Sequence, residues 1–117
     1  MLITLAFSMT IASSHALPAA PSKQPLNCDV GPLEKTIAGS TWLLYSCGDG
    51  STLILITPAG SKSFPFVFSL YRTETGYRLS GEGTGPKVAT DPVAEVLSAL
   101  SPQNIAILID QTKAVKK

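Results

Sequence analysis

The sequence predicts an α+β domain: a four-stranded antiparallel meander, preceded by a short helix and covered on one face by two C-terminal helices. Three observations favour this fold class. Between residues 41 and 82 the period of the apolar residues changes from helical to alternating, most strictly over residues 64–70, and after residue 90 apolar residues recur at helical spacing. Turn sequences rich in glycine and proline separate these runs. With 117 residues, the chain has room for one domain.

The first residues read as a secretory signal peptide. An apolar stretch over residues 2–12 precedes Ser14 and Ala16, small residues that suit the last positions before a cleavage site. The stretch is about 10 residues long, too short to cross a bilayer. Either the free amino terminus supplies the positive charge that normally precedes such a stretch, or the true start lies upstream. A buried N-terminal helix or strand is the alternative.

From this reading we expect three segments. Residues 1–16 are the signal peptide, which directs export to the periplasm or the medium and is cleaved off near Ala16. Residues 17–27 are a flexible spacer, because proline and alanine dominate them. Residues 28–117 form the single small domain.

Cys28 and Cys47 are the only cysteines. An even number in an oxidising compartment predicts a disulfide, which would close a loop of about 20 residues and stabilise the fold by roughly 3 kcal/mol. A redox pair normally has a C-x-x-C spacing, and a zinc site needs four ligands, whereas the only histidine, His15, leaves with the signal peptide. We therefore predict a structural disulfide, with no metal site and no cofactor.

The first predicted elements are a short helix and four strands. Residues 31–39 suit a two-turn helix, because Pro32 fits its first position and Gly39 its C-terminal cap. Leu33 and Ile37, four residues apart, would share the buried face of that helix. The predicted strands are residues 41–47, 52–57, 64–72 and 77–82, with turns between them.

Two helices are expected after the glycine-rich loop at residues 81–86. The sequence Thr-Asp-Pro at residues 90–92 starts the first, and its apolar face carries Val93, Val96, Leu97 and Leu100. Ser101-Pro102 starts the second. Residues 105–109 could also form a strand, because several of them are β-branched. We favour a helix because of the Ser-Pro start and the polar residues that follow.

No residue pattern predicts catalysis. The glycines at residues 81–85 lack the spacing of a dinucleotide-binding loop, and Pro86 removes a backbone donor that a phosphate would need. Glu82 is the carboxylate least explained by capping or solvation, yet nothing places a second carboxylate beside it. Without a histidine, and with both cysteines paired, the usual Ser–His and Cys–His nucleophiles are excluded. Composition leaves open a Ser–Lys dyad with Lys62 or Lys87, but no pattern positions either lysine. We expect that the domain is not an enzyme.

The net charge and the aromatic residues indicate which class of partner the chain could bind. The formal net charge of +1 argues against nucleic-acid binding, which needs a basic face. Trp42, Tyr45, Tyr71 and Tyr77 could form an exposed patch for a protein or glycan, although packing in the core or at its edge explains them more simply. We expect no transmembrane segment after the signal peptide, and an exported or envelope protein as partner.

Residues 42–51 (WLLYSCGDGS) and 76–85 (GYRLSGEGTG) resemble small signal-bearing exported bacterial proteins of no known activity. A narrower likeness, in Tyr45-Ser46-Cys47 with Gly50 and Leu53, is to periplasmic C-type lysozyme inhibitors; the later cysteine and the inhibitory loop of that family are absent. The sequence thus favours an exported interaction or accessory module. The alternatives are a binder of a small ligand in a pocket between sheet and helices, and an inhibitor of a cell-wall hydrolase.

Overall fold

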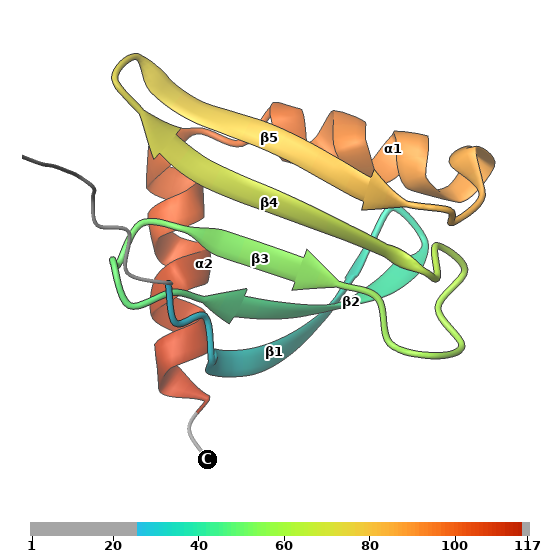
Figure 1. Cartoon of the computed structure of the whole chain (residues 1–117), viewed down its shortest axis with the longest axis horizontal. Coiled ribbons are helices and arrows are strands. Elements are labelled where there is room, and N and C mark those ends of the chain that lie inside the picture. The colour runs from blue at the N-terminus through green and yellow to red at the C-terminus, as the bar shows by residue number, and fades with distance from the viewer. Residues whose placement is uncertain (1–25, 116–117) are drawn as a thin grey trace, which may run out of the picture.

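The computed structural model describes residues 26–115, so the predicted signal peptide and most of the spacer lie outside the described residues. Within this range, strands are followed by helices, as Figure 1 shows. The strands are β1 (Val30–Ile37), β2 (Ser40–Ser46), β3 (Leu53–Ile56), β4 (Phe66–Thr73) and β5 (Gly76–Gly83). The helices are α1 (Lys87–Ser98) and α2 (Pro102–Ala114). The predicted α+β class, with an antiparallel sheet and two C-terminal helices, is confirmed.

The strands form one antiparallel sheet whose spatial order follows chain order, β1-β2-β3-β4-β5. Each strand returns beside the one before it because short connections join them. Both helices lie on the same side of the sheet: α2 packs against β1 and β2, and α1 packs against β5 (Figure 1). No helix or strand of the described residues covers the other side (Figure 1).

The core lies between the sheet and the helices. Alternation along the strands turns every second side chain toward the helices. Trp42 is fully buried there; its ring centroid lies 5.3 Å from that of Phe68, and its indole N–H donates to the Ser40 hydroxyl at 3.2 Å. The buried apolar side chains are Trp42, Leu44, Leu53, Leu55, Phe68, Leu70, Val93, Leu97, Ile105 and Ile109.

Residues 31–39 form an edge strand and its turn, so the predicted helix at this place is wrong and the sheet has a fifth strand. Leu33 and Ile37 do share a face, but as alternate residues of β1, with Lys35 between them opposite Trp42. Gly39 serves the hairpin turn with a φ of 90°, a value that glycine adopts readily. A four-residue spacing fits both a helix and a strand, and pairing with β2 decides between them.

The helix starts were predicted with mixed success. Helix α1 begins at Lys87, before the predicted Thr-Asp-Pro start, and Pro92 lies inside it on the exposed side. The earlier start places Thr90 on the buried face together with Val93 and Leu97, so the Thr90 side chain packs instead of capping. Helix α2 begins as predicted: the Ser101 hydroxyl accepts the N–H of Asn104 at 3.1 Å, and the prediction of a helix over residues 105–109 is confirmed.

The predicted disulfide between Cys28 and Cys47 is present. It ties the segment before β1 to the residue after β2, across a sequence separation of 19. The N–H of Gly48 also donates to the carbonyl of Asn27 at 2.8 Å, so a hydrogen bond joins the same two segments. A disulfide that closes a loop of this size stabilises a fold by roughly 3 kcal/mol.

Candidate protein-interaction face

We call the uncovered side of the sheet the open face. It consists of the side chains of β1 to β5 that alternate with those of the core, and Figure 1 views the molecule from this side. Its members are Glu34, Thr36, Thr41, Leu43, Tyr45, Ile54, Ile56, Val67, Ser69, Tyr71, Thr73, Arg78, Ser80 and Glu82.

Apolar side chains occupy the middle of the open face. Leu43 of β2 lies opposite Ile56 of β3, and Tyr45 lies opposite Ile54. Ile56 is 39% exposed, and the other three are half-buried by their neighbours. The solvent side of an antiparallel sheet normally carries polar residues. A continuous apolar centre on an uncovered side is instead typical of a contact surface.

The four aromatic residues singled out from the sequence do not share one surface. Trp42 is fully buried in the core. Tyr77 packs at the rim of the core, and its hydroxyl donates to the carbonyl of Ser51 at 2.8 Å. Tyr45 and Tyr71 lie on the open face, where Tyr71 is 37% exposed. The structure therefore brings two of the four aromatic residues to the candidate interaction surface.

Glu82 is exposed on the open face near the end of β5, opposite Val67. The glycines beside it face the core. A Cβ on Gly81 would lie 2.9 Å from the rings of both Phe66 and Phe68, closer than real Cβ atoms approach other atoms. The glycine-rich stretch thus makes room for aromatic rings on β4, which is a packing role.

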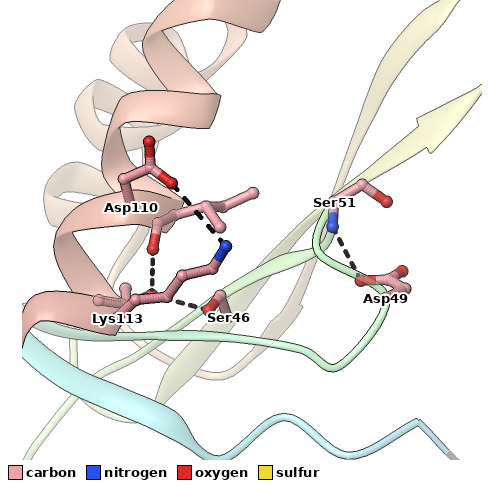
Figure 2. A network of polar contacts seen from close by, with 7 residues as sticks. Ser46, Asp49, Ser51, Asp110 and Lys113 are labelled. Atoms are coloured by element: carbon pink, nitrogen blue, oxygen red, sulfur yellow. Dashed lines mark hydrogen bonds and ion pairs between the residues drawn. The ribbon is translucent and has the colours of Figure 1, made fainter. Parts of the chain in front are cut away.

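A buried hydroxyl pair fixes α2 against β2. The Ser46 hydroxyl lies 2.7 Å from that of Thr112, and the Thr112 hydroxyl donates to the carbonyl of Ile109. Figure 2 shows Ser46 beneath this helix, close to the surface ion pair between Asp110 and Lys113, which spans 3.8 Å. Ser46, the middle residue of the triplet that resembles a lysozyme inhibitor, is therefore used inside the fold.

The turn between β2 and β3 is held by Asp49 (Figure 2). Its carboxylate accepts the N–H groups of Ser51 and Thr52, each at 3.0 Å, and the Thr52 hydroxyl at 2.6 Å. Burial opposes ionisation, but these hydrogen bonds outweigh it, so the pKa of the Asp49 carboxyl lies below its ordinary value. The Asp49 carboxylate therefore stabilises the conformation of this turn through its hydrogen bonds to Ser51 and Thr52.

No family model, curated protein or solved structure matches the chain. Among residues 26–115, no three histidine, cysteine, aspartate or glutamate side chains are grouped as a metal site would require. No single helix of the described part is long and apolar enough to cross a membrane; α1 and α2 together pass on length and composition, with a bend of 109° between them.

The sequence analysis expected a sheet covered on one face only, but it did not identify the apolar residues at the centre of the open face, although a signal for them was present. Residues 53–56 (LILI) are apolar at every position, and so are residues 42–45 (WLLY) apart from the tyrosine hydroxyl. A strand with one wet side alternates, whereas such runs are typical of strands that are covered on both sides. The runs therefore indicated a second apolar surface on β2 and β3.

Proposed function

We propose that the chain is a small exported, non-catalytic module that binds another envelope or secreted protein through the open face. The observation that carries this proposal is the uncovered apolar centre formed by Leu43, Tyr45, Ile54 and Ile56. Transfer of such side chains from water into an interface is favourable by about 25 cal/mol per Å² of apolar area. The disulfide supports export, because such bonds persist in oxidising compartments.

The placement of the carboxylates supports a non-catalytic role. Glu34 and Glu82 belong to β1 and β5, the two edge strands of the sheet. Four strand spacings separate them, roughly 19 Å at about 4.8 Å each. Paired catalytic carboxylates in glycoside hydrolysis lie at most about 9.5 Å apart. The two acids of the open face are therefore too distant to act as a pair on one bond.

Site-specific photocrosslinking tests this proposal. A benzophenone-bearing amino acid replaces Tyr71 on the open face or Gln111 on the exposed side of α2, in the cells that produce the protein. We expect one adduct of defined mass from position 71, no such adduct from position 111, and loss of the first when Ile56→Asp is added. Equal adducts from both positions, or none from position 71, would contradict the proposal. Far-UV circular dichroism checks that each variant is folded.

A cavity between sheet and helices favours a second function, the binding of a small apolar molecule. Its volume is about 310 Å³, at the lower end of the range for ligand pockets. It lies between the β4–β5 turn and the α1–α2 junction, and its lining includes Leu70, Tyr77, Leu79, Leu97, Leu100 and Ile105.

The fluorescent probe 1-anilinonaphthalene-8-sulfonate tests the cavity directly. One molecule should bind to each folded chain, and Leu100→Trp, which fills the cavity, should remove binding. The matched variant Ile107→Trp lies outside the cavity lining on the exposed side of α2, and it should leave binding unchanged. Absence of binding, or binding that Leu100→Trp does not alter, would contradict this second function.

A further inference from the structure

One row of the open face crosses the whole sheet and has an acid at each end. The pairing register aligns Glu34 with Leu43, Leu43 with Ile56, Ile56 with Val67, and Val67 with Glu82. We call these five residues the acid-flanked row. Both glutamates are exposed. The row therefore places three adjacent apolar side chains between two carboxylates on opposite edges of the sheet.

The width of the row matches an α-helix. Its apolar part covers three strands, or roughly 10 Å from the first to the third at about 4.8 Å per spacing. An α-helix with its side chains is about 10–12 Å across. A helix lying along β3 would cover Leu43, Ile56 and Val67, and long side chains on its two flanks would point toward Glu34 and Glu82.

The charges at the two ends of the row determine which residues a bound helix needs beside its apolar stripe. Of the members of the open face, only Glu34, Glu82 and Arg78 are charged. Arg78 lies on β5 four residues from Glu82, roughly 13 Å away at about 3.3 Å per residue, so the row itself stays acidic. Lysine or arginine on both sides of an apolar stripe complements this arrangement.

The same charges disfavour two other occupants. If a second copy stacked on this face with the rows in register, carboxylates would lie over carboxylates, because both ends of the row are glutamate. An anionic membrane surface would also be repelled by the two edges. A basic protein segment meets neither obstacle.

We propose that the open face receives a cationic amphipathic helix of a partner protein, whose apolar stripe covers Leu43, Ile56 and Val67 while basic side chains on its flanks pair with Glu34 and Glu82. This inference rests on the proposed function, since it names the kind of segment that the interaction face binds. The centre of the row would make apolar contacts with the helix, and the carboxylates at its edges would form ion pairs with the helix.

The inference is tested by titrating a peptide into the protein while NMR monitors the protein signals. The probe is an 18-residue helical peptide of leucine and lysine with one apolar stripe, added to the isotopically labelled, oxidised protein made from its full coding sequence. The matched peptide has glutamate in place of every lysine. We expect the lysine peptide to shift the signals of Leu43, Ile56 and Val67 to saturation, and the glutamate peptide to leave them in place.

The double variant E34Q/E82Q isolates the charged edges. We expect it to weaken lysine-peptide binding roughly three- to tenfold, which lies within the range for two exposed ion pairs, and added salt should reduce the difference in affinity between the variant and the original protein. The control E74Q/E95Q makes the same charge change outside the open face, where both residues are exposed, and should change affinity less than about twofold. Equal binding of the two peptides, shifts that map to the helices, or unchanged affinity in E34Q/E82Q would overturn the inference.

Two further outcomes assign the face to a different occupant. Concentration-dependent shifts of the row without peptide, with a dimer mass in sedimentation, would assign the face to a second copy. Binding to phosphatidylglycerol vesicles that involves the same signals would assign it to a membrane surface. Either result overturns the cationic helix. A photo-adduct from position 71 that persists undiminished in E34Q/E82Q would also overturn the cationic helix, while the proposed function would stand. If the protein without these two substitutions gives no adduct from position 71, the proposed function itself is contradicted.

Discussion

On β3, Leu55 is fully buried against the helices, whereas Ile56, the next residue, points to the other side of the sheet and is 39% exposed. The two residues have the same size and similar hydrophobicity. The same contrast holds along β2 between Trp42 and Tyr45. One side of the sheet thus uses its apolar residues to hold the domain together, while the other side keeps its apolar residues accessible. Alternation along the strands thus separates the residues that stabilise the core from those that form the proposed interaction surface.

Truncation on β2 should show the largest difference between the two sides. Trp42→Ala removes a fully buried ring that contacts Phe68, and we expect it to lower the free energy of unfolding by about 3–5 kcal/mol. Tyr45→Ala, on the open face, should cost about 1 kcal/mol. Urea unfolding monitored by circular dichroism measures both. Equal losses would show that the open face contributes to the core.

Loss of the disulfide should lower stability without changing recognition. Reduction, or the double variant Cys28→Ala/Cys47→Ala, is expected to cost roughly 3 kcal/mol, because the bond restricts the unfolded chain. The two treatments serve as controls for each other in the same urea titration. The photo-adduct from position 71 should persist wherever the reduced protein is folded. Its disappearance from folded protein would mean that the bond shapes the open face.

A smaller effect is expected for the buried hydroxyl that joins the sheet to α2. Ser46→Ala removes its hydrogen bond to Thr112, and we expect a loss of about 1 kcal/mol. The matched variant Ser69→Ala, on the open face, should stay within about 0.5 kcal/mol of the original protein. Differential scanning calorimetry compares the two. A larger effect from Ser69 would reverse the assignment of the faces.

An effect of similar size is expected for Asp49, which belongs to a turn and to neither face. Its pKa is lowered in the folded state, so it stabilises the fold above its ordinary pKa, and this contribution is lost as the pH falls below about 4. Asp49→Asn should cost about 1 kcal/mol at neutral pH and should flatten the acid limb of the stability profile. Unfolding titrations from pH 7 to pH 2 measure this. Identical acid limbs would contradict the role of the carboxylate.

Much of the fold could be predicted from local sequence. Runs rich in aliphatic and aromatic residues located β2 to β5, glycine and proline marked the turns, and Ser101-Pro102 marked the start of α2. β1 could not be identified in this way, because Leu33 and Ile37 fit both periods and only pairing with β2 decides between them. The start of α1 likewise depends on Thr90, whose place in the core is a tertiary effect.

The candidate site was harder to predict than the fold. The acid-flanked row joins residues from five strands, and its members become neighbours only through the register of the sheet. Composition alone gave equal weight to Trp42 and Tyr71, although the first is buried and the second is exposed. The apolar run over residues 53–56 was the local signal that both sides of β3 are apolar, and it did not say which side is covered.

Matched truncation of Leu55 and Ile56 tests the separation of the two faces most directly. Leu55→Ala and Ile56→Ala are each measured for the free energy of unfolding in urea and for the yield of photo-adduct from position 71. We predict that Leu55→Ala lowers stability by about 2–5 kcal/mol and keeps the adduct in folded protein. Ile56→Ala should cost about 1 kcal/mol or less and lose most of the adduct. An Ile56→Ala variant that keeps the full adduct, or that loses as much stability as Leu55→Ala, would contradict the account.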